Sequence, residues 1–157
     1  MKNEIFFDDD HWDVQGYSKE LQKLLPRFNK ETANFLKNHS FHDGKVVSLK
    51  VLNKENGITK DPTVILMVIK QYAETAGIYE IQWQNVRKFF MDYDITRNVY
   101  GNNPKEIAFG GRNGLDDWGY DEITPLSKKK LKHEIYLFSQ TKIIIHCTNI
   151  IIRKVKA

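Results

Sequence analysis

Closely spaced carboxylates are the side chains of this sequence with the clearest chemical potential, because two carboxylates can act as general acid and general base. The densest such group surrounds two aromatic residues and consists of Asp116, Asp117, Trp118, Tyr120, Asp121 and Glu122. It matches no catalytic motif, whereas an aromatic side chain among acidic loop residues is typical of a protein interface. We therefore expect these six residues to contact a partner, and the alternative that Trp118 packs into the core stays open.

Histidine, aspartate and cysteine side chains at three other places could bind a metal ion or act on a substrate. His42 and Asp43 precede a glycine and have no third strong ligand nearby, so they favour a turn over a zinc site. The acidic run 8–13 lacks the glycine and glutamate positions of a calcium-binding loop. Cys147 stands among isoleucines, which is typical of a small buried residue. The sequence thus predicts no metal ligand, no cofactor and no catalytic residue, and it favours a protein that is not an enzyme.

The strongest basic run begins with Lys128, Lys129 and Lys130. Together with the basic side chains of residues 153–156, this run could bind the phosphates of a nucleic acid. The net charge is only +4, and an acidic N-terminal segment contrasts with the basic C-terminal end. We favour a solvated basic surface and keep nucleic-acid binding as an alternative.

Length and composition limit the kind of protein this chain can be. A chain of 157 residues, of which 41% are hydrophobic, is long enough to form one domain with its own core. Because it has one cysteine, it cannot form an internal disulfide, and we expect a cytoplasmic location. The first residues lack the apolar stretch of a signal peptide, and no apolar run approaches the roughly 18 residues of a membrane span. We expect no membrane association, and the oligomeric state is left open.

Apolar residues recur at helical spacing between residues 18 and 37. The hydroxyl of Ser18 can cap a first turn, and Pro26 interrupts the pattern because it lacks an N–H donor. Asn29 can cap a second stretch. The segment therefore predicts one kinked helix or two short helices.

The longer remainder of the chain, residues 43–155, shows the alternation and the apolar runs of β-strands. Residues 63–72 are almost continuously apolar, so we expect this strand to be covered on both faces. Residues 98–122 are rich in glycine and are expected to form irregular loops. Residues 141–155 form either one long strand with a bulge at Thr148 or two strands.

These elements predict a single α+β domain over residues 1–157, in which residues 1–17 form an acidic and aromatic N-terminal segment. The helices come before about six or seven mostly antiparallel strands, because turns rather than helical crossovers connect the strand segments. The expected architecture is a sandwich or a partly open barrel.

Several segments of the chain follow one another in a distinctive order. They are residues 41–49 (FHDGKVVSL), the hydrophobic strand 63–69, and residues 81–86, 133–135 and 143–150. This order resembles a diffuse group of small bacterial proteins, some of which are proposed to be immunity proteins of polymorphic toxin systems. The resemblance implies a β-rich fold and, for some members, neutralisation of a toxin by binding. It implies no catalytic residues.

The function we expect is therefore that of a non-enzymatic module that binds another protein, in the form of an immunity protein that blocks a toxin. One alternative is a small-ligand binder or an enzyme that uses the loops 98–122. A second alternative is nucleic-acid binding through the C-terminal lysines.

Overall fold

A computed structural model describes residues 14–53, 63–72, 75–94 and 115–156 of the chain. Two α-helices and one short 3₁₀ helix come first, and eight strands follow. The helices are α1 (Val14–Leu24), η1 (Leu25–Arg27) and α2 (Lys30–Asn38). The strands are β1 (Lys45–Asn53), β2 (Thr63–Gln71), β3 (Gly77–Gln84), β4 (Lys88–Asp92), β5 (Trp118–Pro125), β6 (Leu131–Leu137), β7 (Lys142–Cys147) and β8 (Asn149–Lys156). The predicted α+β class is confirmed, with one or two more strands than expected.

The helical segment divides into two short helices at the predicted place. Pro26 lies in the 3₁₀ turn between them, and the Asn29 side chain accepts a hydrogen bond from the Thr32 N–H at 2.8 Å, which caps α2. The prediction that Ser18 begins the first helix is wrong, because α1 already includes Val14. A tertiary contact favours the earlier turn: the Tyr17 hydroxyl accepts a hydrogen bond from the Ile123 N–H of β5 at 2.8 Å.

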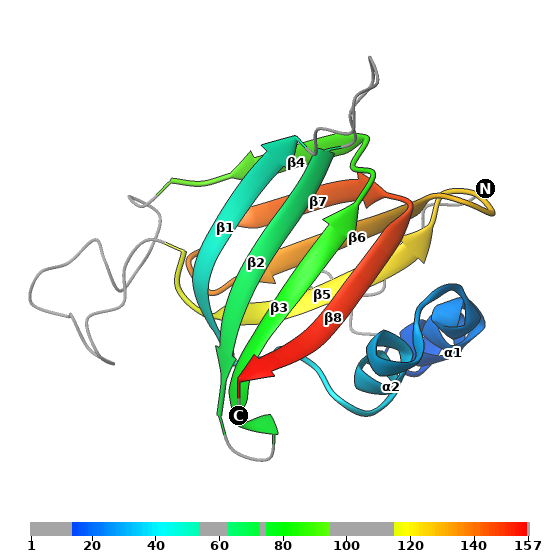
Figure 1. The fold of residues 1–157 in the computed structure, drawn as a ribbon, viewed down its shortest axis with the longest axis horizontal. Helices are drawn as coiled ribbons and strands as arrows, with labels where there is room; N and C mark the ends of the chain where they lie inside the picture. The colour runs from blue at the N-terminus through cyan, green and yellow to red at the C-terminus, as the bar shows by residue number, and fades with distance from the viewer. Residues whose placement is uncertain (1–13, 54–62, 73–74, 95–114, 157) are drawn as a thin grey trace, which may run out of the picture.

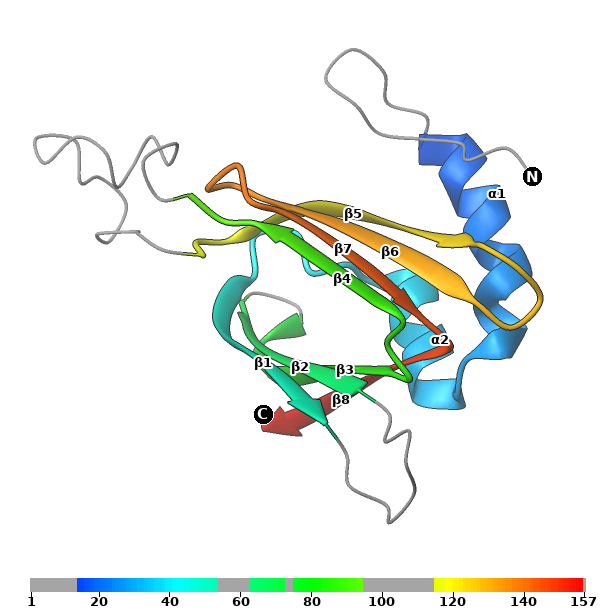
Figure 2. The ribbon, with the colours of Figure 1, turned by 90° about the horizontal axis from the view of Figure 1, so that it is seen from above.

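The strands form two four-stranded antiparallel sheets that are not closed into a barrel. Sheet 1 has the order β1-β2-β3-β8, and sheet 2 has the order β4-β7-β6-β5. The strands of one sheet cross those of the other at a steep angle (Figure 1), and the two sheets lie face to face (Figure 2). Of the two predicted architectures, a sandwich and a partly open barrel, the structure has the sandwich.

The two sheets are linked at two corners, by the chain itself at the first and by a hydrogen bond at the second. At the first corner β3 continues into β4 and β7 continues into β8, and the crossing is held by the Thr148 N–H, which donates to the Gln84 carbonyl at 3.1 Å. Residues 141–155 thus form two strands in different sheets rather than one bulged strand. At the second corner the Trp118 N–H donates to the Gly44 carbonyl at 2.8 Å, which links the starts of β1 and β5.

The core lies between the sheets, and the two helices close one of its sides. In β2 the side chains of Ile65, Met67 and Ile69 are fully buried, whereas Lys70 is exposed and its outward neighbour Val68 is only half-buried. The prediction that this strand is covered on both faces is therefore wrong. The helices do not cover the outer face of sheet 1, because α2 packs along the edge strand β8 and α1 along the edge strand β5 (Figure 2).

The predicted irregular region ends earlier than expected. Residues 118–122 belong to β5, and residues 95–114 lie outside the described part of the chain. Gly119, which the sequence suggests is a loop residue, is required by strand pairing, since a Cβ atom there would lie 2.7 Å from the Tyr136 carbonyl oxygen. The register of β5 against β6 shifts at this glycine.

Candidate functional site

The six predicted interface residues do not form an exposed loop. Trp118 is 1% exposed and packs in the core, so the prediction of an exposed Trp118 is wrong and the core alternative holds. Asp116 and Glu122 are also buried, whereas Asp117, Tyr120 and Asp121 are partly exposed. Pairing of β5 with β6 turns alternate side chains of this cluster toward opposite faces of sheet 2.

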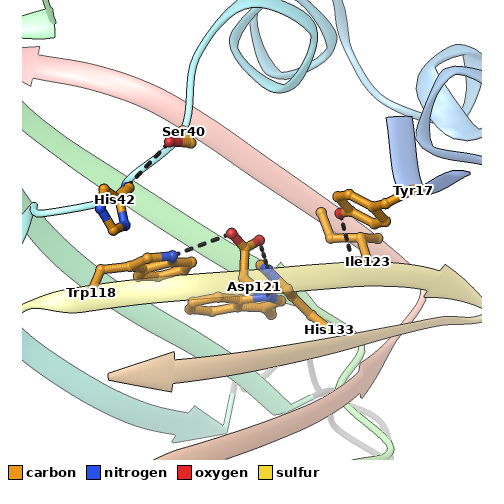
Figure 3. A network of polar contacts seen from close by, with 8 residues as sticks. Tyr17, Ser40, His42, Trp118, Asp121, Ile123 and His133 are labelled. Carbon is orange, nitrogen blue, oxygen red and sulfur yellow. Dashed lines mark hydrogen bonds and ion pairs between the residues drawn. The ribbon is translucent and has the colours of Figure 1, made fainter. Parts of the chain in front are cut away.

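A chain of hydrogen bonds connects the two sheets through the core (Figure 3). The Trp83 indole N–H of β3 donates to His133 Nδ1 of β6 at 2.9 Å. His133 Nε2 lies 2.7 Å from Asp121 Oδ2, and the Trp118 indole N–H donates to Asp121 Oδ1 at 3.2 Å. Because His133 Nδ1 accepts, its proton is on Nε2, and the neutral ring donates to the carboxylate.

This arrangement holds the fold together rather than activating a nucleophile. An aspartate–histidine pair acts as a general base only when the second ring nitrogen is free to take a proton from the reacting group. In this protein that nitrogen is occupied by the Trp83 indole, and His133 is buried. The Tyr17 phenol lies nearby, and its pKa is raised well above the ordinary value by burial and by the charge of Asp121.

His42 and Asp43 form the predicted turn. The Gly44 N–H donates to the Phe41 carbonyl at 2.7 Å, and Asp43 adopts a positive φ of 65°. The His42 ring bonds the Gly119 carbonyl through Nδ1, so the turn fastens the start of β1 to β5. No group of three or more His, Cys, Asp or Glu side chains within the described ranges is placed to hold a metal ion.

Lys128, Lys129 and Lys130 form the exposed tip of the β5–β6 hairpin. The Ser127 hydroxyl accepts from the N–H of Lys129 and of Lys130, which fixes the backbone of the tip. The second predicted basic group lies on β8 in the other sheet, where Arg153 pairs with Glu80 at 3.1 Å. The structure therefore does not bring the two basic groups together.

Strand register assembles a different basic row on the outer face of sheet 2. Lys132, His146 and Lys88 are direct neighbours across β6, β7 and β4. Partial burial and the charges of Lys88 and Lys132 lower the pKa of His146. Lys132 also pairs with Glu134 at 3.0 Å, which offsets part of the positive charge.

Cys147 is buried at the end of β7, and burial raises its pKa to about 12. A thiol with such a pKa stays protonated at neutral pH and is a poor nucleophile.

A cavity of about 180 Å³ lies between α2 and β8 and is lined by Glu31, Asn34, Phe35, His39, Tyr79, Ile152, Arg153 and Lys154. It is smaller than the roughly 300 Å³ at which ligand pockets begin.

No helix in the described part of the chain is long and apolar enough to cross a membrane.

Sequence reasoning missed a surface on the edge strands β1 and β4. We define the β1–β4 edge surface as the five large apolar residues that are at least 36% exposed in the second half of β1, in β4 and directly after β4: Val51, Leu52, Phe89, Phe90 and Tyr93. β1 is one of the two edge strands of sheet 1, and β4 is one of the two edge strands of sheet 2. The two strands come opposite one another on the side of the sandwich away from the helices (Figures 1 and 2).

Two members of the β1–β4 edge surface point toward the interior and are nevertheless exposed. Val51 pairs with Ile65, and Phe89 pairs with Ile145, and both of these partners are fully buried. Directly opposed residues share a face of the sheet, so Val51 and Phe89 lie on the core faces. They are still 48% and 36% exposed, and the sandwich is thus open between β1 and β4.

The fold defines this protein as an α+β sandwich of two four-stranded antiparallel sheets with a helical pair along one side. No protein-family model matches the chain, and no curated protein matches it.

Proposed function

We propose that this protein is a non-enzymatic module that binds another protein at the β1–β4 edge surface. The observation that carries the proposal is the partial exposure of Val51 and Phe89, which face the core but are still 48% and 36% exposed. Burying a large apolar side chain stabilises by about 1.5–3 kcal/mol relative to leaving it in water. A bound partner would recover this free energy at several neighbouring positions.

The strand edges themselves support a partner that binds as a strand. Within the described ranges, β4 pairs with β7 alone, and β1 pairs with β2 and forms one bridge, from Lys45 to Asp117, the residue before β5. Unpaired strand edges present N–H and C=O groups that an extended segment of another protein can use. Exposed aromatic residues such as Phe90 then provide anchors beside the ladder.

The resemblance to toxin-immunity proteins makes a toxin the first partner to test. Immunity proteins act by covering a toxin, so binding without chemistry is sufficient for the role. The ionisable groups that the structure brings together, above all His133 and Asp121, stabilise the fold. We propose a cytoplasmic location for the encounter, as the single cysteine led us to expect.

Serine substitutions on this surface are expected to weaken binding by about 30-fold or more, the effect of removing a hot-spot anchor. Val51→Ser and Phe90→Ser would each be compared with the wild-type protein by affinity capture from a cytoplasmic extract of the native host, followed by calorimetric titration of the captured protein. The melting temperature should change by less than about 4 °C, because both residues are already about half exposed, at 48% and 45%.

The matched control is Phe138→Ser, which removes an equally exposed phenylalanine from the turn between β6 and β7. It should leave the affinity unchanged. If the surface variants bind as tightly as the wild-type protein does, partner binding at this surface is ruled out.

The row of Lys132, His146 and Lys88 favours a second candidate function, the binding of single-stranded nucleic acid. Fluorescence anisotropy with a labelled oligonucleotide at low salt would show binding that weakens steeply as salt increases. Lys88→Ala should weaken binding of the oligonucleotide relative to the wild-type protein, and Lys50→Ala, which lies on sheet 1, should leave it unchanged. Because Lys132 already pairs with Glu134, we rank this function below protein binding.

A further inference from the structure

The second half of β1 presents a strand edge that an added strand can use. Just before β1, the Trp118 N–H donates to the Gly44 carbonyl at 2.8 Å. At its start, the Val46 N–H donates to the Asp116 carbonyl at 3.4 Å. Beyond Val46, no residue of the described ranges bonds the backbone of β1 on the side away from β2. Residues 48–53 can therefore pair with a further strand on that side.

The charge beside this edge favours one kind of strand. We propose that β1 binds an extended segment of another protein, which places a carboxylate opposite Lys50 and an apolar residue on either side of that carboxylate. The proposal rests on the function proposed above, in which the β1–β4 edge surface binds protein, and it names the chemistry of the partner.

Lys50 points outward from sheet 1 among uncharged side chains. It alternates with Val51, which pairs with the fully buried Ile65 and so lies on the core face. The nearest outward neighbours of Lys50 on β1 and β2 are Ser48, Leu52, Val64, Leu66 and Val68. None of these neighbours has a carboxylate that could offset the charge of Lys50.

The outer face of sheet 1 carries further positive charge. Lys45 and Lys70 are directly opposed on this face. Among the strand residues described there, Glu80 is the only carboxylate, and it already pairs with Arg153 at 3.1 Å. Such a face attracts a negatively charged partner and repels a basic one.

The inward residues of β1 determine the apolar positions of the segment. Leu49 and Val51 pair with residues of β2 that are fully buried, and Val51 is nevertheless 48% exposed. In a strand paired with β1, the residues on either side of the carboxylate would face inward and cover Val51 at the open side of the sandwich. The segment should therefore read apolar, acidic, apolar in either chain direction.

Other occupants fit this edge less well. Antiparallel pairing with β1 of a second copy, centred on Lys50, would bring two lysines together, and lysines on edge strands usually prevent such pairing. A lipid surface would meet the outer face and leave Val51 uncovered on the inner face. The other strand of this surface, β4, carries both Lys88 and Asp92 and so favours neither sign of charge.

Labelled peptides that differ at their central residue test the pairing, by fluorescence anisotropy with the full chain. The peptide Ser-Val-Ile-Glu-Val-Thr-Ser should bind with a Kd below about 500 µM. The same peptide with a central lysine should bind about tenfold more weakly, because an attractive pair across the strands becomes a repulsive one. Lys50→Glu should reverse this preference, and salt at about 1 M should reduce it in both proteins.

Lys88→Glu on β4 is the matched control and should leave the preference for the glutamate peptide unchanged. Equal affinities for the two peptides, or no binding of the glutamate peptide at about 500 µM, overturn the inference. It is also overturned if the bound peptide shifts the amide NMR signals of β4 and leaves those of residues 48–53 in place. Binding to phosphatidylserine vesicles that Lys50→Glu abolishes, without binding of the peptide, would assign this face to lipid instead.

Capture of a protein from the native host separates this inference from the proposed function. If Phe90→Ser abolishes capture and Lys50→Glu leaves it unchanged, the acidic segment is overturned and the proposed function stands. If neither Phe90→Ser nor Val51→Ser changes capture, the proposed function itself is contradicted.

Discussion

Asp121→Ala is expected to lower the free energy of unfolding by about 2–6 kcal/mol, because each of two buried donors that loses its acceptor costs about 1–3 kcal/mol. The substitution removes the acceptor of two hydrogen bonds, from His133 Nε2 and from the Trp118 indole N–H. Both donors would be left without that acceptor in the core, where His133 and Trp118 are buried. Urea unfolding followed by circular dichroism gives the value directly.

Glu80→Ala is the matched control for this variant. The side chains of Glu80 and Asp121 are similarly exposed, at 23% and 19%. Glu80 pairs at the surface with Arg153, and such pairs contribute about 0–1 kcal/mol. Equal losses in the two variants would show that the interior network has no special role in stability.

Trp118→Ala is expected to lower the free energy of unfolding by about 3–5 kcal/mol, as removal of a large core aromatic residue does. Trp118 is buried and lies 5.3 Å from Phe41 between ring centroids, so an alanine would leave a cavity at the corner where β1 meets β5. Thermal unfolding would measure the loss. Trp118→Phe keeps most of the ring and should cost less, mainly the hydrogen bond to Asp121.

The same two variants separate a core role for Trp118 from an interface role. If Trp118 were an interface anchor, its loss would weaken partner binding and leave stability unchanged. We expect the reverse. In the Asp121→Ala background, Trp118→Phe should cost little, because the acceptor of its N–H is already gone.

Local features of the fold could be predicted from the sequence because they depend on neighbouring residues. Asn29 and Pro26 determine the break between the two helices through a side-chain cap and a missing N–H. The turn at His42 and Asp43 follows in the same way from its glycine. The crossing at Thr148 could be predicted only as one of two outcomes, because a bulge and a sheet exchange have the same local sequence.

Long-range pairing explains what the sequence could not reveal. The backbone N–H of Trp118 donates a hydrogen bond to the carbonyl of Gly44, a residue 74 positions earlier, and this contact holds Trp118 in its buried position. No residue near Trp118 in the sequence indicates that contact. His133 follows a run of lysines in the sequence, but it alternates with Leu131 and Ile135, whose spacing indicates a shared core face. That alternation was the available signal for a buried histidine.

The β1–β4 edge surface could not be predicted for a related reason. Val51 and Phe89 look like core residues because they alternate with outward residues, and the structure indeed turns them inward. Their exposure depends on how far the two sheets diverge at that side, which is a property of the packed sandwich. The sequence predicts an interface at Tyr120 and Asp117 instead, because aromatic residues next to acidic residues in the sequence are typical of interfaces.

Photo-crosslinking in the native host tests the central claim most directly. Benzoylphenylalanine would replace Phe90, which is 45% exposed on β4, and in a separate strain Phe138, which is 39% exposed in a turn. We predict a covalent adduct of discrete mass between position 90 and another protein, and no adduct from position 138. No adduct from position 90 above the level at position 138 would contradict the account.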